Sequence, residues 1–284
     1  MQQTWFITGS SRGFGRALVQ AALDAGDRVV ATARRPEQLA DLARQYGDQL
    51  VPVALDVSDP DAVQAAVAVA LETFGRLDVV VNNAGYANVA PIETGQEEDF
   101  RTQFETNFWG VYHVSRAVIA QLRAQGGGTI VQFSSIGGRV GGSPGIASYQ
   151  AAKFAVDGFS RVLAVETAPF GIRVMVVEPS GFATDWAGSS MTAHEIPADY
   201  DATIGEMHRR MRTSPAGPAG DPARAAQIIV QAVKRDSPPS HLLLGENAVD
   251  MALDYSRRQI AEASEWEKVS RSADFVQAYP VELP

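Results

Sequence analysis

Short apolar runs alternate with helical patterns along about the first 180 residues, and this alternation limits the folds open to the chain. The runs are nearly continuous in aliphatic residues, as in strands that are buried on both faces of a sheet. They read TWFIT, RVVATA, LVPVAL, LDVVVNNAG, GTIVQFSS and IRVMVVEP, and helices are expected near residues 36–46, 60–74, 97–124 and 148–168. Strands that alternate with helices of this length predict βαβ units and a Rossmann-type, doubly wound parallel sheet of the α/β class. Because these six strands follow one another without a break, one domain over residues 1–284 is expected.

The pattern changes after Pro179. Residues 180–215 carry no strand pattern, and in a compact domain a segment this long is usually functional or disordered. We therefore predict a substrate lid over about residues 180–220. Its larger side chains suit a hydrophobic substrate, and they are Phe182, Trp186, Met191 and Tyr200.

The last part of the chain returns to regular structure. A helix is expected near residues 222–235, then a further strand in SHLLLG, then a helix over 247–263. The C-terminal extension, about residues 246–284, carries Tyr255 and Trp266 and would either close the pocket or form a subunit interface.

The charge balance and the cysteine content exclude several classes of function. A net charge of −9 argues against nucleic acid or an anionic membrane as a partner. The chain has no cysteine, which removes disulfides, thiolate zinc sites and cysteine nucleophiles, and its four histidines are not spaced for metal binding. The first residues, MQQTWFITGSS, show no signal peptide, and no apolar stretch approaches the length of a spanning helix. These features predict a cytoplasmic protein without a metal site.

The stretch ITGSSRGFG, residues 7–15, can be interpreted in two ways. It contains G-x-S-x-G, the turn that presents a nucleophilic serine in hydrolases, here Ser11. It also places Gly9, Gly13 and Gly15 where a glycine-rich turn cradles phosphates at the start of a helix. A hydrolase of that type takes part of its oxyanion hole from an earlier strand, but only one short strand precedes Ser11, which favours the phosphate cradle. A merely structural turn remains an equal alternative on this stretch alone.

Four further motifs follow the glycine turn in a fixed order. They are NNAG at residues 82–85, a serine pair that ends the fifth strand, SYQAAK at 148–153 and PSGFAT at 179–184. With T-G-x3-G-x-G from Thr8 to Gly15, this series resembles the short-chain dehydrogenase/reductase family, in register from about residue 4 to 185.

The resemblance implies a catalytic set of Ser135, Tyr149, Lys153 and Asn107. Tyr149 would be the general acid/base, and Lys153, on the same helix face, would lower its pKa from about 10 toward neutrality. The family usually places the serine thirteen residues before the tyrosine, whereas Ser135 lies fourteen before and Ser134 fifteen, so the loop carries one extra residue. Ser135, the second of the pair, fits the family pattern better. Asn107 matches the family's helix-kinking asparagine in a proton relay, or is an ordinary polar residue of a helix.

The resemblance also implies a dinucleotide site. Asp56 would contact the adenine, or it is an acid at a helix N-terminus; Thr184 would bind the nicotinamide carboxamide. The chain has Ser180 where the family commonly has glycine. The implied cofactor-binding residues are Gly9, Ser11, Arg12, Gly13, Phe14, Gly15, Arg34, Asp56, Asn83, Ala84, Gly85, Tyr149, Lys153, Pro179, Gly181 and Thr184.

The end of the second strand indicates which dinucleotide is used. NAD-preferring folds have an acid there, whereas this chain has Arg34 followed by Arg35, and the first acid is Glu37. A guanidinium grips a 2′-phosphate that a carboxylate would repel, and Arg12 adds a second cation. NADP(H) is therefore predicted, with solvated loop arginines as the alternative.

We thus expect an NADP(H)-dependent oxidoreductase that interconverts a carbonyl and a secondary alcohol of a small-molecule substrate. The alternatives are a dinucleotide-sensing protein without catalysis and a serine hydrolase that uses Ser11. The family usually associates through its long helices, here about 97–124 and 148–168, so a homodimer or homotetramer is expected.

Overall fold

The computed structural model describes residues 2–184, 191–213 and 220–275. Its centre is one parallel sheet in the order β3-β2-β1-β4-β5-β6-β7, which confirms the predicted Rossmann-type fold. The strands are β1 (Thr4–Ile7), β2 (Arg28–Ala33), β3 (Leu50–Ala54), β4 (Val79–Asn82), β5 (Gly128–Phe133), β6 (Ile172–Pro179) and β7 (His241–Leu244). The strand order reverses between β1 and β4, and this switch point is where such sheets bind ligands.

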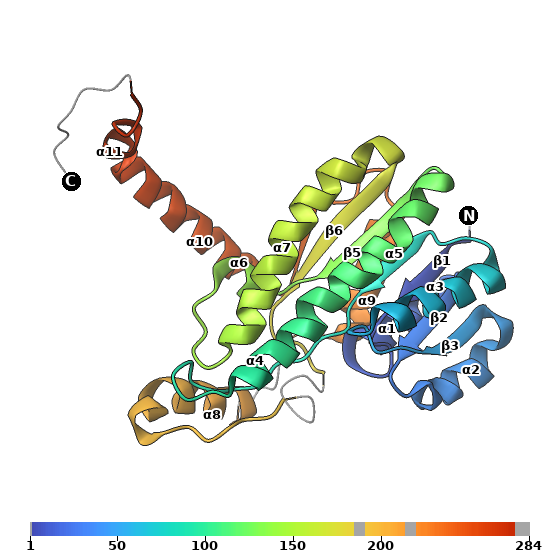
Figure 1. Ribbon diagram of the computed structural model, residues 1–284, viewed down its shortest axis with the longest axis horizontal. Coiled ribbons are helices and arrows are strands. Elements are labelled where there is room, and N and C mark those ends of the chain that lie inside the picture. Colours follow the sequence, from blue (N-terminus) through green and yellow to red (C-terminus); the bar gives the residue numbers. More distant parts are fainter. Residues whose placement is uncertain (1, 185–190, 214–219, 276–284) are drawn as a thin grey trace.

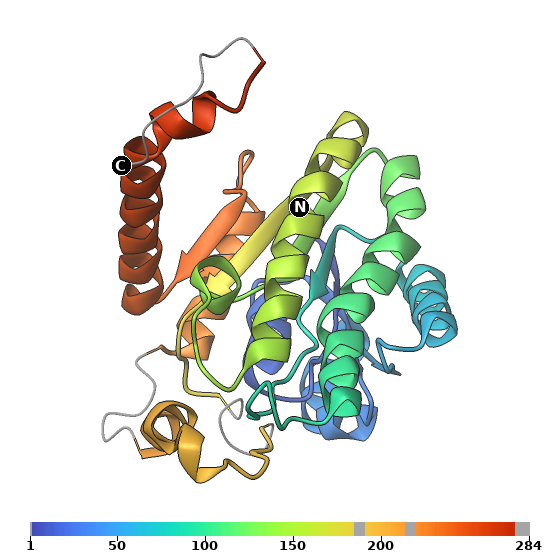
Figure 2. The ribbon, with the colours of Figure 1, turned by 60° about the vertical axis from the view of Figure 1, so that its left-hand side comes forward.

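Helices cover both faces of the sheet (Figures 1 and 2). The larger ones are α1 (Gly13–Asp24), α2 (Ala40–Tyr46), α3 (Pro60–Phe74), α4 (Glu97–Phe104), α5 (Gly110–Ala124), α7 (Ala147–Thr167), α8 (Glu206–Thr213), α9 (Pro222–Val233) and α10 (Glu246–Glu265). Short helices are η1 (Pro36–Leu39), η2 (Gly47–Gln49), η4 (Ala168–Phe170), α6 (Gly137–Val140), η6 (Ala198–Tyr200) and α11 (Glu267–Arg271), and π-turns are η3 (Glu105–Trp109) and η7 (Asp201–Gly205).

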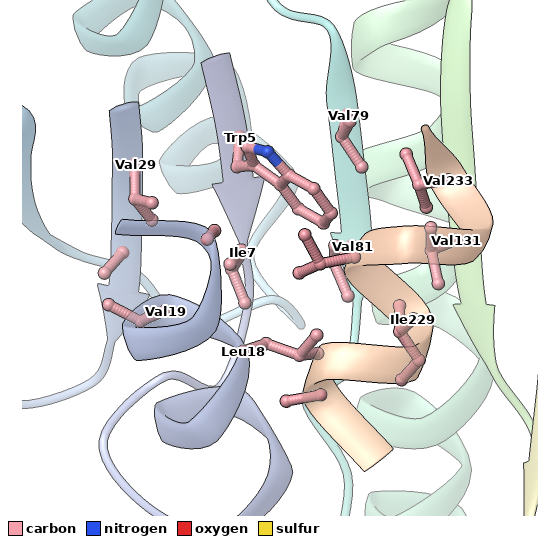
Figure 3. Packing of buried hydrophobic residues seen from close by; sticks show 14 of the residues in the cluster. Trp5, Ile7, Leu18, Val19, Val29, Val79, Val81, Val131, Ile229 and Val233 are labelled. Atoms are coloured by element: carbon pink, nitrogen blue, oxygen red, sulfur yellow. The ribbon is translucent and has the colours of Figure 1, made fainter. Parts of the chain in front are cut away.

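Two apolar cores fix these layers. On one face, α1, α2 and α9 pack on the sheet, and Figure 3 shows Leu18 and Ile229 meeting Ile7 and Val131 of the strands. On the other face, α3, α5 and α7 form the second core. Because both faces are covered, the strands are nearly continuous runs of aliphatic residues, as the sequence indicated.

Helix α3 shows how local chemistry sets an element. The Asp59 carboxylate accepts bonds from the amides of Asp61 and Ala62 at 2.9 and 3.1 Å, and Pro60 occupies the first helical position. Gly75 ends the helix in the left-handed conformation. The cap is therefore Asp59, and the alternative that Asp56 is the acid at this helix start is wrong.

Two segments depart from the expected pattern. The helix expected over 97–124 is interrupted by the π-turn η3, so α4 and α5 are separate. The segment expected to be a loop over 180–215 contains α8 and two shorter helical turns.

The C-terminal helix α10 leads away from the sheet and from α8 (Figures 1 and 2). Its first turns pack on the short helix α6, with Ala248 and Ala252 against Ile136 and Val140. In the described residues, α10 takes no part in the apolar cluster around Tyr149. No described helix is long and apolar enough to cross a membrane.

Candidate active site

The glycine turn between β1 and α1 has no room for a Cβ at Gly9 or Gly15. Gly9 and Gly13 have φ values of 66° and 54°, in the left-handed region. A Cβ on Gly9 would lie 2.8 Å from the Ala84 Cα, and a Cβ on Gly15 would lie 2.2 Å from the Gly9 carbonyl oxygen. Over Gly13, the nearest atom would be the Thr184 Cβ at 3.4 Å. The turn is thus held close to the NNAG segment, with backbone exposed at the N-terminus of α1.

Thr8 ties this turn to the end of β4. Its hydroxyl donates to the Val81 carbonyl at 3.1 Å and accepts from the amides of Asn83 and Ala84 at 3.0 and 3.1 Å. The Asn83 side chain donates to the carbonyls of Thr8 and Gly9 at 2.9 and 3.1 Å. The sequence predicts Asn83 as a site residue but not Thr8, although Thr8 is the first residue of the glycine motif.

The residues between the glycines have different surroundings. Arg12 is exposed and precedes α1 without capping it through its side chain. Phe14 packs on Phe133 and Phe182, with ring centroids 5.5 and 4.8 Å apart, so its side chain serves the core. Ser11 is half-buried in the turn.

The histidines do not support a hydrolase at Ser11. The ring of His113 contacts the Val57 carbonyl oxygen at 3.2 Å, and those of His194 and His241 lie 3.3 and 2.7 Å from Asp99 and Asp157.

Ser135 and Ser134 face different partners. The Ser135 hydroxyl accepts from the Gly137 amide at 3.1 Å and shares a hydrogen bond with the Tyr149 phenol. The Ser134 hydroxyl is buried and donates to the Lys153 carbonyl at 3.0 Å. The structure thus brings Ser135, and not Ser134, to Tyr149, despite the extra residue in the loop.

Lys153 lies within the protein behind Tyr149. Its ammonium donates to the Phe133 carbonyl at 2.7 Å and lies 5.6 Å from the centre of the Tyr149 ring. Burial lowers the Lys153 pKa to about 8. Burial also raises the Tyr149 pKa to about 12, against the smaller lowering by Ser135. The protein groups alone thus hold the phenol pKa above its usual value, and the lowering expected from Lys153 stays a prediction for the enzyme with its dinucleotide bound.

Asn107 is buried in the π-turn η3. Its amide nitrogen donates to the Tyr86 and Gln103 carbonyls, both at 2.8 Å, and its oxygen accepts from the Tyr86 amide at 3.2 Å. A Cβ on Gly85 would lie 2.5 Å from the Asn107 oxygen and 3.4 Å from the Lys153 ammonium. Because Gly85 has no side chain, Asn107 and Lys153 can both approach the backbone there. The Asn107 side chain thus makes specific contacts near Lys153 and is more than an ordinary polar side chain of a helix.

Arg34 and Asp56 stand near each other beyond the ends of β2 and β3. Both side chains are exposed. Partial burial raises the Asp56 pKa, but hydrogen bonds from the Ser58 hydroxyl and amide at 2.6 and 3.0 Å, together with the charge of Arg34, bring the pKa below its usual value. A cation and a carboxylate therefore border the place where the adenine end of a dinucleotide is expected.

The loop after β6 is anchored at several points. The Pro179 carbonyl accepts from the Ile136 amide at 3.1 Å, and the Gly181 carbonyl accepts from the Gly220 amide at 3.2 Å. The Ser180 amide donates to the Leu244 carbonyl at 3.0 Å, so the departure from glycine is accommodated. Thr184 faces Gly13 across the mouth of the glycine turn.

An apolar cluster covers Tyr149. Its buried members are Ala87, Val89, Ile146, Tyr149 and Ile204, and the half-buried ones are Met191, Ile196, Tyr200, Met207 and Met211. Of the predicted lid residues, Met191 and Tyr200 belong to it, Phe182 packs on Phe14 instead, and Trp186 lies outside the described residues. The sequence does not predict that Ile204, Met207 and Met211 belong to this cluster, because no helix is expected there.

Comparisons with known proteins agree with this arrangement. A family model described as short chain dehydrogenase matches residues 3–195. The chain is 48% identical over 271 residues to Oxidoreductase BOA17 of Botryotinia fuckeliana, which covers 95% of this chain and 98% of that protein.

Solved structures give the same result. A short-chain dehydrogenase from Streptomyces avermitilis is 39% identical, with a TM-score of 0.90, over 96% of this chain and 98% of that one. A short chain dehydrogenase from Burkholderia cenocepacia in complex with NADP is 25% identical, with a TM-score of 0.73, over 93% of this chain and 98% of that one. A 3-ketoacyl-(acyl-carrier-protein) reductase from Brucella melitensis complexed with NADH is 27% identical, with a TM-score of 0.70, over 85% and 96%.

Proposed function

This chain belongs to the short-chain dehydrogenase/reductase family and is an oxidoreductase, and from that premise we propose that it uses NADP(H) to interconvert a carbonyl compound and a secondary alcohol. One observation carries the proposal. Ser135, Tyr149 and Lys153 meet at the end of the sheet where the glycine turn and the NNAG segment also lie. Neither a dinucleotide sensor nor a hydrolase would need this set.

The residues present fit a dinucleotide. The turn packs so closely on itself and on Ala84 that a Cβ at Gly9 or Gly15 would force it apart, and it opens at the N-terminus of α1, which favours a pyrophosphate. We assign binding to this turn, to Asn83, and to the loop from Pro179 to Thr184. The bound nicotinamide would supply the hydride that is exchanged with the substrate carbon.

The phenol of Tyr149 would move the proton. The phenol is protonated at neutral pH, and it would donate its proton to the carbonyl oxygen as that oxygen gains charge. Ser135 would hold the same oxygen through its hydroxyl. Lys153 lies beside the phenol, and Asn107 approaches Lys153 at Gly85. These two side chains would relay a proton back to the phenol after it has donated its own.

The preference for NADP(H) rests on Arg34. It stands at the end of β2, where an NAD-preferring fold has an acid, and Arg12 lies exposed at the start of α1. If each guanidinium contributes about 1.5–3 kcal/mol to a bound 2′-phosphate, loss of either weakens NADPH binding about 10- to 100-fold.

The cluster over Tyr149 supports a hydrophobic substrate. Met191, Met207 and Met211 surround it, and methionine side chains adapt to irregular apolar groups. The lid touches the loop before Tyr149 directly, since a Cβ on Gly145 would lie 2.7 Å from Ile204.

Association and location are further parts of the proposal. Exposed apolar side chains lie on the long helices, among them Trp109 of η3 and Phe154, Val162 and Val165 of α7, and a second copy of the chain would cover them. A homodimer or homotetramer in the cytoplasm is therefore proposed. A strictly monomeric species in light scattering at micromolar concentration would contradict this.

The test is an assay of hydrophobic ketones and alcohols that follows the absorbance of the reduced nicotinamide. We expect kcat/KM with NADPH to exceed that with NADH by at least about tenfold, and Arg34→Asp to reverse the preference. Arg44→Asp, at the end of α2, is the matched control and should leave the preference unchanged. Equal use of both dinucleotides would refute the NADP(H) assignment, and no turnover with any substrate would refute the activity.

A further inference from the structure

The loop between Ser135 and Tyr149 has unusual backbone freedom. It is longer by one residue than the family spacing implies, and Gly141, Gly142 and Gly145 all have φ in the left-handed region, at 66°, 78° and 84°. Glycine loses more conformational freedom on folding than any other residue. A specific contact is therefore needed to keep the Ser135 hydroxyl against the Tyr149 phenol.

Gln150 supplies such a contact. Its side chain is 7% exposed, and its Oε1 accepts from the Ser143 amide at 3.1 Å. This bond fixes the orientation of the amide group, because only the oxygen can accept. Its Nε2 is buried and has no hydrogen-bond partner in the described part of the chain.

The other end of the same amide lies against the turn that carries Ser135. A Cβ on Gly137 would lie 3.0 Å from the Gln150 Nε2 and 3.5 Å from the Ser135 hydroxyl oxygen. The Gly137 amide in turn donates to that hydroxyl at 3.1 Å. Gln150 thus lies against Gly137, Gly137 bonds to Ser135, and Ser135 bonds to Tyr149. Because Gln150 follows Tyr149 on α7, these contacts form a ring.

We propose that Gln150 is a positioning residue, which holds the lengthened loop at Ser143 and at Gly137 so that Ser135 meets Tyr149. The inference rests on the proposed oxidoreductase function, which it deepens. Gln150 touches no reacting atom in this proposal, and its effect passes through Ser135.

The variants separate the hydrogen bond from simple packing. Gln150→Met keeps the volume and removes the acceptor, whereas Gln150→Glu, assayed at a pH where its buried carboxyl is neutral, keeps an oxygen for the Ser143 amide and replaces the unpartnered Nε2. Gln64→Met, at an exposed position of α3, is the matched control.

With a carbonyl substrate and NADPH, we expect Gln150→Met to lower kcat about 5- to 10-fold, as for one lost hydrogen bond, with KM for NADPH unchanged. Gln150→Glu should recover kcat to within about twofold of the wild type. The pH profile adds a readout that packing alone would not move. Because the hydrogen bond from Ser135 lowers the Tyr149 pKa, loss of that bond should change the pH dependence of kcat in Gln150→Met and leave it unchanged in Gln64→Met.

Hydrogen exchange makes the inference independent of activity. The amide of Ser143 should exchange faster in Gln150→Met than in the wild type or in Gln64→Met. Unchanged exchange, or an equal loss of kcat in Gln150→Glu and Gln150→Met, would overturn the positioning role. If the wild type turns over no substrate, the proposed function fails, and the exchange measurement still decides whether Gln150 holds the loop.

Discussion

Removal of the Arg139 guanidinium is expected to destabilise the protein strongly. Arg139 lies in α6, just after Ser135, and Glu178 lies at the end of β6, just before the loop assigned to the cofactor. The Arg139 Nε lies 3.1 and 3.0 Å from the two carboxylate oxygens, and its Nη2 donates at 2.8 Å. The Glu178 side chain is fully buried, whereas that of Arg139 is 24% exposed. Arg139→Met would therefore leave a buried carboxylate without its cation.

The magnitude follows from this burial. Breaking a buried ion pair from one side costs about 3–5 kcal/mol, and the partial exposure of Arg139 favours the lower end, about 3 kcal/mol. For a chain of this size that loss corresponds to a fall in Tm of roughly 5 °C. The double variant Arg139→Met with Glu178→Gln should lose less than Arg139→Met alone, because no carboxylate then remains to be buried.

Thermal and urea unfolding of Arg139→Met, Glu178→Gln and the double variant would measure these changes in the free energy of unfolding. Arg161→Met is the control, since Arg161 pairs with Asp157 at 2.8 Å but is 56% exposed, and an exposed pair contributes less than about 1 kcal/mol. If Arg139→Met lowers the free energy of unfolding no more than Arg161→Met does, the reasoning from burial is refuted.

Three further predictions concern the catalytic set. Tyr149→Phe should lower kcat by at least about 10²-fold while NADPH still binds in a fluorescence titration, and substantial residual turnover would contradict its role. Ser135→Ala should lower kcat on the order of 10²-fold and Ser134→Ala less, and the reverse order would assign the substrate oxygen to Ser134. Because burial lowers the Lys153 pKa to about 8, its ammonium is lost as the pH rises through that value. Carbonyl reduction should therefore decline above about pH 8, and a profile flat to pH 10 would contradict this.

The sheet could be predicted because its determinants are local. Runs such as RVVATA and IRVMVVEP are mostly aliphatic, and β2 and β6 occupy those residues. Likewise Asp59, Pro60 and Gly75 bound α3 through caps that are visible in the sequence. The π-turn η3 could not be predicted, because it depends on bonds from Asn107 to Tyr86, which is distant in sequence.

The lid shows the same limit. Between Pro179 and residue 220 the sequence lacks a long apolar period, so the helix α8 was not expected. The cluster formed by Ile204, Met207 and Met211 depends on Val89 and Tyr149 for its burial. Tertiary contacts, and not local propensity, decide the structure there.

The pKa of Tyr149 is a site property that spacing alone does not decide. The i, i+4 spacing correctly puts Lys153 and Tyr149 on one face of α7, and a cation there favours the ionised phenol. The same face, however, is turned into the protein, where the Lys153 side chain bonds to the Phe133 carbonyl and the phenol lies under the lid cluster. Burial raises the pKa of a phenol and lowers that of an ammonium, so each group is moved toward its neutral form. Spacing therefore predicts which two groups meet, whereas their pKa values depend on the balance between burial and charge that the surrounding packing sets.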